Sequence, residues 1–336
     1  MRLRHLKLAL FLVVSGLVTG WSVRSWYVRE ALFMGTTLTA SVSSSSRDAS
    51  LCAIDSVFAA VRRVDDILND WRSDTELARL NNAEPGVAVT IEPALRPYLD
   101  EIVDWNSRTE AAFDPGIGAL VTAWDLRGAG RVPPDSVLRQ ALAHSGLVRF
   151  LPDTASRHAQ RPDQSSWIDA GGFGKGAALR AARDQLQRLG VYGAILNFGG
   201  QVLALGDTTL SVDVAHPVHR FRPAASLRLK QASASTTSQS ERFVEVAGRR
   251  LGHVLDPRSG VPVPAWGSVT VVHPDPMIAD ILSTALFVMG PEAGMRWLEG
   301  QPIAALFLIP AGDSLEVRST PAMQLILAHP SDSRGS

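Results

Sequence analysis

Only one cysteine, Cys52, occurs among the 336 residues of the sequence. A single cysteine excludes an intrachain disulfide and a CxxC metal or redox motif, and we expect it to be a small buried apolar residue. An excess of charge is also lacking, because 33 Lys and Arg residues balance 33 Asp and Glu residues. Nucleic-acid-binding proteins usually carry a basic surplus, so we expect no nucleic acid partner. An anionic ligand must therefore be held by local features of a site.

The apolar run at the N-terminus is too short for a comfortable membrane span. Three basic residues within positions 1–7 precede a run from Leu8 to about Trp21, the order found in a secretory signal. A span needs ~20 residues, and neither an A-x-A cleavage site nor a cysteine for a lipid follows the run. A cleaved signal, an uncleaved anchor and a marginal span extended through residues 23–27 all stay open. In each case we expect the remaining chain on the periplasmic side of a bacterial inner membrane.

The pattern of apolar residues beyond the N-terminus predicts a mixture of helices and strands. Residues 22–33 read as a linker and the serine-rich stretch 41–46 reads as a loop. Helical spacing predicts helices over 50–69, 94–110, 133–144, 177–189 and 277–289, with another from residue 292. Short β-type runs predict strands at 36–42, 166–168, 194–198, 201–205, 210–214, 243–246, 251–255, 268–272, 304–309 and 314–319.

These elements do not follow strict βαβ alternation, which favours the α+β class. The sequence shows no internal repeat, and no interior linker is long enough to separate two domains. We therefore expect a signal or anchor at 1–27, one large mixed domain over 28–325, and a short tail at 326–336.

The helix expected after Pro276 places two oxygen ligands on one face. Asp275 can cap this helix, and Pro276 suits its first position. Asp280 and Thr284 lie four residues apart, so a carboxylate and a hydroxyl could bind the same hard cation. The alternative is a solvated Asp280 with Thr284 bonded to the backbone of its own helix.

A glycine-rich segment from Asp169 to Gly176 follows an expected strand and opens a helix. Such a loop lets backbone N–H groups approach phosphate oxygens, and a helix N-terminus favours anions. Lys175 adds a positive charge. The segment matches neither a P-loop nor G-x-G-x-x-G, and a tight strand-to-helix turn is the alternative.

Three further segments carry weaker signals. His253 lies in an expected strand before a turn at 256–260; beside a phosphate it could act as a general base, although a packed histidine is the alternative. Phe113 could pack on a flat ring or simply anchor its loop. The two glycines of Asn197–Gly200 end a strand, where a ligand or another chain can approach closely.

In their order along the chain, these segments resemble the ApbE-type FAD:protein FMN transferases. The matching segments are Met34–Thr37, Ser73–Leu77 with Leu80–Asn81, Phe113–Pro115, Asp169–Gly176, Asn197–Gly200, His253–Gly260 and Ala279–Thr284. The resemblance implies a T-fold-like α+β enzyme with Mg²⁺ as cofactor and FAD as substrate. Such an enzyme transfers the FMN moiety through a phosphoester bond to a Thr or Ser hydroxyl of a periplasm-facing redox protein, and AMP is released.

The resemblance also implies roles for individual residues. The metal would be bound by Asp280, Thr284 and the backbone carbonyl of Gly172, and His253 would help to activate the acceptor hydroxyl, with charge from Lys175. Contacts to FAD would fall on Met34, Trp71, Ala112, Phe113, Asp114, Asp169, Lys175 and Leu255.

The sequence departs from the family pattern in several places. It reads Thr237–Phe243 where a Ser-Gly pair with Tyr is common, has Gly174 where Ala is usual, and lacks the lipid-attachment cysteine. Two other functions stay open: a FAD diphosphatase that uses water as acceptor, and a non-catalytic, membrane-tethered flavin carrier or assembly factor. Acceptor docking is a surface property that these motifs do not encode. The intact ligand and base residues count against the non-catalytic alternative.

Overall fold

The computed structural model describes residues 25–151, 156–207, 209–239, 243–246, 248–312 and 314–328. Its centre is an eight-stranded sheet in which every pair of neighbours is antiparallel. In spatial order the strands are β1 (Tyr27–Phe33), β2 (Thr36–Ser43), β5 (Gly193–Phe198), β6 (Gln201–Gly206), β9 (Ala232–Ser238), β12 (Ser268–His273), β13 (Ala304–Ala311) and β14 (Ser314–Ser319).

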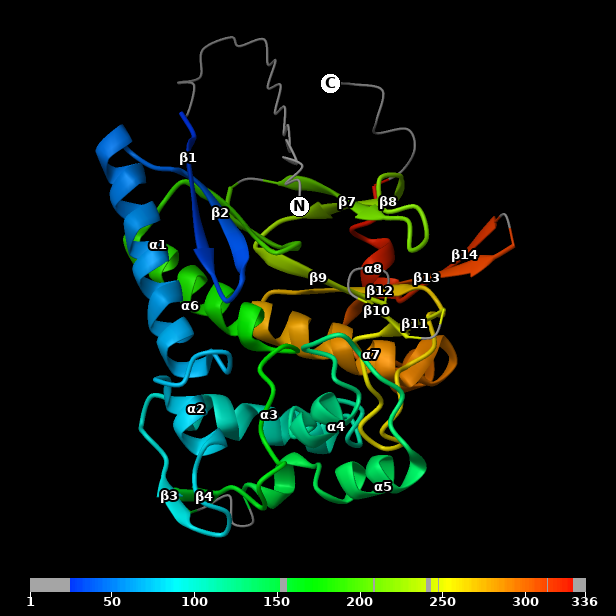
Figure 1. The fold of residues 1–336 in the computed structure, drawn as a ribbon. Coiled ribbons are helices and arrows are strands. Elements are labelled where there is room, and N and C mark those ends of the chain that lie inside the picture. The colour runs from blue at the N-terminus through cyan, green and yellow to red at the C-terminus, as the bar shows by residue number, and fades with distance from the viewer. Residues whose placement is uncertain are drawn as a thin grey trace, which may run out of the picture.

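Three helices cover one face of this sheet (Figure 1). They are α1 (Arg47–Leu68), α6 (Gly174–Leu189) and α7 (Pro276–Trp297), and their buried apolar side chains form the main core with the strands. In the described part of the chain, α7 alone has the length and hydropathy of a membrane span. It packs against β9, β12 and α6, however, and is mostly buried, as expected for a core helix.

The opposite face of the sheet is covered by a hairpin and a short helix. The hairpin joins β7 (Leu210–Ala215) to β8 (Pro223–Leu229), and the helix is α8 (Pro321–Gln324). Leu227, Leu306 and Met323 are fully buried in the cluster that joins them to the sheet. Figure 1 shows this hairpin on the side away from α7.

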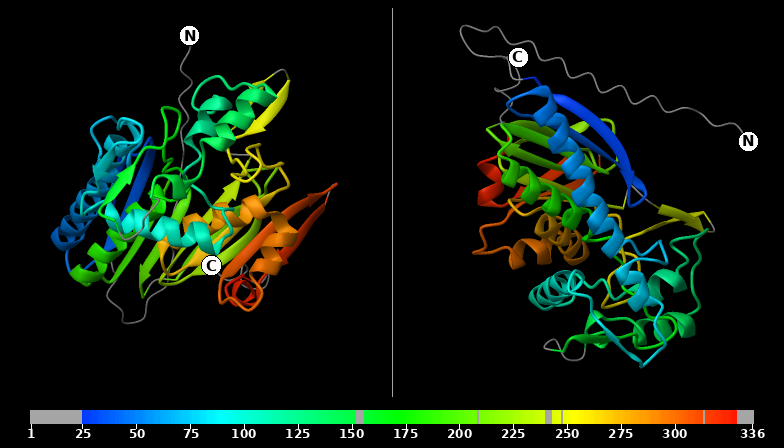
Figure 2. Two further views of the ribbon diagram at one scale, coloured as in Figure 1. Left: turned by 90° about the horizontal axis from the view of Figure 1, so that it is seen from below. Right: turned by 90° about the vertical axis from the view of Figure 1, so that its left-hand side faces the viewer.

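A second layer of short elements lies beyond the helices, below the sheet in Figure 1 and in the right-hand view of Figure 2. The elements are α2 (Glu76–Asn81), β3 (Ala88–Thr90), α3 (Arg96–Arg108), α4 (Gly118–Ala123), α5 (Asp135–Ala143), a 3₁₀ turn (Leu147–Arg149) and β4 (His158–Gln160). The apolar residues of α2, α3 and the 3₁₀ turn belong to the same core cluster as the sheet, whereas those of α4 and α5 form a smaller cluster of their own.

A second hairpin connects this layer to the sheet. It consists of β10 (Phe243–Val246) and β11 (Arg249–Gly252), and the segment that follows it packs on α4 and α5. Leu255 is 2% exposed in that cluster, and the Trp124 indole N–H donates to the carbonyl of Gly260 at 2.8 Å. The residues that follow β11 therefore lie close to the glycine segment (Asp169–Gly176), and the two segments line one cavity.

Most expected elements are present, and the expectation for α7 was accurate in detail. Asp275 caps this helix by accepting from the backbone N–H of Met277 at 2.9 Å, and Pro276 occupies its first turn. Gly290 has φ 76° and interrupts the helix before its last part, which runs to Trp297. This break lies between the two helices expected at 277–289 and from 292.

Several expectations were wrong. Residues 27–33 form strand β1, not a linker, because they pair with β2 and bury Phe33 against Phe58. Positions 41–43 of the serine-rich stretch belong to β2. Cys52 is exposed on α1, not buried.

Errors near the site have identifiable causes. Residues 166–168 form no strand, because the backbone of Ile168 bonds to the side-chain amide of Asn81 instead of a neighbouring strand. His253 lies just beyond β11, not inside a strand. Strands β8 and β9 were missed; β9 reads ASASTTS and lacks the apolar alternation that marks a strand.

Candidate active site

A cavity of about 330 Å³ lies where the sheet helices meet the second layer. This volume is within the range of small-molecule sites. Eleven of the twelve residues predicted for the site line it: Trp71, Ala112, Phe113, Asp114, Asp169, Gly172, Lys175, His253, Leu255, Asp280 and Thr284. Met34 does not; it occupies the β1–β2 turn with φ 46° and packs near Gly174.

The glycine segment bends from the second layer into α6. Its first residue, Asp169, donates its backbone N–H to the carbonyl of Pro115 at 2.8 Å and accepts from the N–H of Gly171 at 2.7 Å. A Cβ on Gly172 would stand 3.3 Å from the Phe113 ring and 3.4 Å from the Thr284 hydroxyl oxygen. The backbone at Gly172 is therefore adjacent to the Thr284 side chain on α7.

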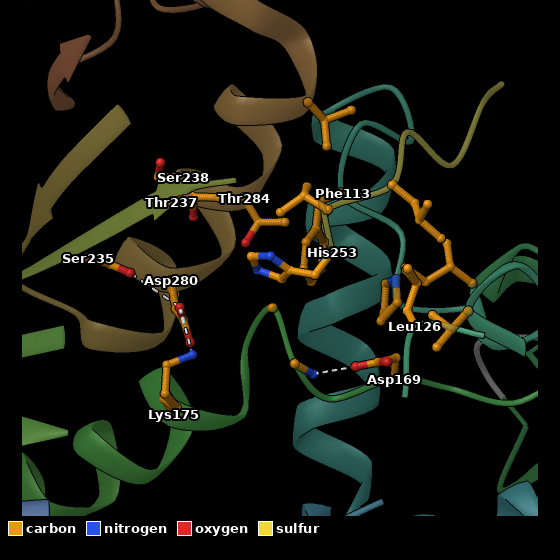
Figure 3. Close-up of a pocket in the computed structure, with 18 of the residues that line it drawn as sticks. Phe113, Leu126, Asp169, Lys175, Ser235, Thr237, Ser238, His253, Asp280 and Thr284 are labelled. Carbon is orange, nitrogen blue, oxygen red and sulfur yellow. Dashed lines mark hydrogen bonds and ion pairs between the residues drawn. The ribbon is translucent and has the colours of Figure 1, made fainter. Parts of the chain in front are cut away.

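Asp280 is the buried carboxylate of the cavity, with 5% of its side chain exposed. Its Oδ2 accepts from the backbone N–H of Gly176 at 3.0 Å, and its Oδ1 accepts from the Ser235 hydroxyl at 3.2 Å. Lys175 Nζ is 3.8 Å from Oδ1. Figure 3 shows Lys175 and Ser235 directed at this carboxylate from opposite sides. The carboxylate is held by backbone and side chain together.

A glycine at position 176 is required for this contact. A Cβ there would stand 2.6 Å from the carbonyl oxygen of Pro276, 2.7 Å from Met277 Cα and 2.8 Å from Asp280 Cβ. The start of α6 and the start of α7 therefore touch backbone to backbone, which no larger residue allows.

Hydroxyl groups of β9 extend the polar network behind Asp280. Ser283 Oγ donates to the Asp280 carbonyl at 3.0 Å and lies 2.8 Å from Thr237 Oγ1 and 3.2 Å from Ser235 Oγ. The sequence did not predict these residues as part of the site, because strand β9 itself was not predicted. The only signal was the run of small polar residues at 232–238.

The metal ligands that the family resemblance predicts, which are Asp280, Thr284 and the Gly172 carbonyl, would offer only oxygens. Within the residues that the structure describes, no group of three or more His, Cys, Asp or Glu side chains could hold a metal ion. One carboxylate with neutral oxygens suits Mg²⁺, which keeps several waters and shares phosphate oxygens with a substrate. It does not suit Zn²⁺, which prefers nitrogen and sulfur. The residues present therefore fit Mg²⁺.

His253 reaches the cavity from the segment after β11. Its ring is directed toward the side that carries Thr284, Thr237 and Asp280 (Figure 3). The buried amide of Gln239 holds the next residue, because it accepts from the N–H of Val254 at 3.1 Å and donates to the Val254 carbonyl at 2.9 Å. Gln239 stands in the stretch where the sequence departs from the family pattern.

The wall from Ala112 to Asp114 is shaped mainly by buried contacts. Phe113 is 2% exposed and meets the Phe173 ring edge-on, with 6.5 Å between centroids. The Asp114 carboxylate accepts from the backbone N–H groups of Gly116 and Leu147 at 2.7 and 2.9 Å. Burial raises the pKa of Asp114 above its usual value. This wall offers a ligand little aromatic surface.

A group that no sequence pattern predicted lies beside Asp169. The Asp70 carboxylate is 5% exposed, accepts from the N–H of Ala170 at 3.0 Å and pairs with Arg127 at 2.8 Å. Burial, and then the charge of Asp169, raise the pKa of Asp70 to about 6. The three partners come together only through the fold, so no local pattern could have predicted the group.

A sequence model of the ApbE family matches residues 34–307, most of the chain. The chain belongs to the ApbE family. Family membership confirms the resemblance that the motifs indicated. The α+β fold is confirmed as well, because solved ApbE structures share it.

Relatives in this family carry a common name. The chain is similar to a FAD:protein FMN transferase of Klebsiella pneumoniae (strain 342), with 31% identity over 75% of this chain and 80% of the relative. It is also 31% identical to a FAD:protein FMN transferase of Rhodobacter capsulatus, over 76% of this chain and 50% of that protein. The crystal structure of the Pseudomonas stutzeri flavinyl transferase ApbE in its apo form superposes with a TM-score of 0.77 and 26% identity, covering 90% of this chain and 97% of that one.

Proposed function

We propose that this chain transfers the FMN moiety of FAD to a Thr or Ser hydroxyl of a partner redox protein. Its named relatives are FAD:protein FMN transferases, which supports FAD as substrate and a protein as acceptor. The observation that carries the proposal is the meeting of two helix starts at Asp280. There a glycine-segment N–H and Lys175 converge on a carboxylate one turn from Thr284.

The pyrophosphate of FAD would lie against the glycine segment at the start of α6. Backbone N–H groups of a helix N-terminus point toward an anion there, and the helix dipole favours negative charge. Lys175 Nζ, with 31% of its side chain exposed, adds a positive charge at the same place. These groups would bind the pyrophosphate of FAD and would also stabilise the negative charge that develops on it in the transition state.

Asp280, Thr284 and the carbonyl of Gly172 would hold Mg²⁺. Bound there, the ion supplies charge neutralisation at the phosphate oxygens. The hydrogen bonds from Gly176 and Ser235 fix the Asp280 carboxylate in one orientation, and the Lys175 ammonium lies 3.8 Å from it.

The transfer itself exchanges one P–O bond for another. The acceptor hydroxyl oxygen bonds to the FMN-side phosphorus, while the bond from that phosphorus to the bridging oxygen breaks. AMP leaves with the bridging oxygen. The hydroxyl proton passes to an imidazole nitrogen of His253, which lines the same cavity.

One assay separates transfer from hydrolysis. The protein is incubated with FAD, Mg²⁺ and a purified redox subunit that carries a Ser or Thr acceptor motif. We expect AMP release together with flavin fluorescence on the denatured acceptor band. AMP with free FMN alone would assign the chain as a FAD diphosphatase, and no AMP would contradict both enzymatic functions.

The same proposal includes a location on the outer face of the bacterial inner membrane, or in the periplasm if the N-terminal segment is cleaved. It is supported by the basic and apolar order of residues 1–21, which lie outside the described residues. A reporter fused to the C-terminus should be active only in its periplasmic form. Activity of a cytoplasmic reporter at that position would contradict the proposed location.

A further inference from the structure

Three flat groups are stacked beside the cavity. The guanidinium carbon of Arg127 lies 4.1 Å from the ring centroid of Trp167 and 4.3 Å from that of Trp71. Both distances are those of cation–π contacts. Arg127 and Trp71 also line the cavity, so the stack forms part of its wall.

The Trp167 layer of the stack is fixed by its surroundings. Its indole N–H donates to the Thr122 hydroxyl at 3.2 Å. A Cβ on Gly118 would stand 2.3 Å from the Trp167 ring, so helix α4 packs directly against it. These contacts hold the Trp167 ring in place, and the Arg127 guanidinium packs on it.

Arg127 also joins two carboxylates of different segments. Its Nη2 lies 2.8 Å from Asp70 Oδ2 and 3.2 Å from Asp169 Oδ2. Asp169 opens the glycine segment, and Asp70 accepts from the N–H of Ala170 in that same segment. One guanidinium therefore sets the position of the segment start as well as that of Trp71.

Trp71 itself is 68% exposed, although it lines the cavity. The other aromatic residue of the wall, Phe113, is 2% exposed and offers almost no surface. An aromatic ring that is supported by a cation on one side and open on the other is suited to stack on a planar ligand ring. FAD carries two such rings, the isoalloxazine and the adenine.

We propose that Arg127 is a positioning residue: it holds Trp71 as a stacking surface for one planar ring of FAD and keeps Asp169 in place at the glycine segment. This inference rests on the proposed function. Arg127 acts on the binding of FAD and not on the carboxylate at Asp280, because its partners are Trp71, Trp167, Asp70 and Asp169.

The test compares Asp70→Asn with the double variant Arg127→Met/Asp70→Asn. The two differ only at Arg127, and neither leaves a buried carboxylate at position 70 without its cation. FAD binding is measured without acceptor, by quenching of tryptophan fluorescence. We expect the double variant to raise the Kd for FAD about tenfold over Asp70→Asn, while kcat at saturating FAD changes less than about threefold. An unchanged Kd would overturn the proposal.

Arg127→Lys separates stacking from charge. Lysine can keep the ion pairs with Asp70 and Asp169 but presents no flat surface to the two indoles. We expect it to weaken FAD binding as the double variant does, with wild-type thermal stability. Wild-type affinity in Arg127→Lys would show that charge alone matters, and would contradict the proposal.

Binding of FMN and of AMP identifies the ring concerned. The half-molecule whose Kd rises in the double variant is the one that lies on Trp71, and no change for either would contradict the stack as a binding surface. These measurements need no turnover. If the wild-type protein binds FAD but transfers no flavin, the proposed function fails while the role of Arg127 stands.

Discussion

Asp70 shows how burial and charge compete at a single residue. Its carboxylate is 5% exposed and shares one cation, Arg127, with a second carboxylate, Asp169. Burial outweighs the attraction of Arg127, and the pKa of Asp70 rises from 3.8 to about 6. The folded protein therefore binds a proton at Asp70 over a pH range in which the unfolded chain has lost it.

Because the pKa of Asp70 differs between the folded and the unfolded state, the free energy of unfolding depends on pH. Between about pH 4 and pH 6 the folded state holds the Asp70 proton and the unfolded state does not, so stability falls as pH rises. We expect Asp70→Asn to match the wild type near pH 4 and to exceed its free energy of unfolding by up to about 3 kcal/mol at pH 8. Asparagine can accept the bonds from Ala170 and Arg127 at the same oxygen position. Urea unfolding at the two pH values measures the gap, and a gap independent of pH would contradict the assignment.

At the residue scale, the sequence predicted those site residues that lie close together along the chain at a regular spacing. Asp280 and Thr284 became candidates because they lie one helical turn apart, the family resemblance then implied a metal site there, and the structure places both at the cavity. Asp70 and Arg127 are 57 positions apart, and only the fold brings them into contact. Ser235 and Gln239 were not predicted either, because their contacts also form only in the fold. Ser235 of β9 bonds to Asp280, and Gln239 bonds to Val254, the residue after His253.

At the scale of elements, the contact between α6 and α7 determines the site. Asp275 caps α7 and also pairs with Arg180 of α6 at 2.8 Å, which ties the two helix starts together. The backbone N–H of Gly176 then reaches Asp280 directly. The proposed metal ligands of α7 and the glycine segment that opens α6 are thus positioned by the same contact.

Gly176→Ala tests this contact. The added Cβ would meet the Pro276 carbonyl at 2.6 Å, so α6 and α7 must separate. We expect a loss of about 1–3 kcal/mol in the free energy of unfolding and a large loss of activity. Gly174→Ala is the matched control, because its Cβ would find no atom nearer than 3.5 Å. Equal behaviour of the two variants in urea unfolding and AMP release would contradict this role of Gly176.

Elements with strong apolar periodicity were predictable, and elements stabilised by tertiary pairing were not. The long helices α1, α6 and α7 and the hairpin of β13 and β14 followed their patterns. Strand β1 was missed because its register depends on β2, and β9 because its residues are small and polar. Residues 166–168 were wrongly taken as a strand, since their partner is the side chain of Asn81.

At the scale of the whole molecule, the cavity exists because two layers meet, and α2, α3 and the 3₁₀ turn of the second layer share a core with the sheet. The sheet with its helices supplies Asp280, Thr284 and Lys175, and the second layer supplies Phe113 and Asp169. The sequence indicated all of these segments but not their arrangement. The order of motifs identified the family, and only the fold shows that the segments converge on one cavity.

The central claim is that Asp280 and Thr284 hold the Mg²⁺ with which the chain cleaves FAD. The most direct measurement is AMP release as a function of Mg²⁺ concentration for the wild type, Thr284→Ser and Thr284→Val. We expect the serine variant, which keeps the hydroxyl ligand, to follow the wild type. The valine variant should need about tenfold more Mg²⁺, as expected for the loss of one ligand interaction of about 1.4 kcal/mol. Wild-type Mg²⁺ dependence in Thr284→Val would contradict the account.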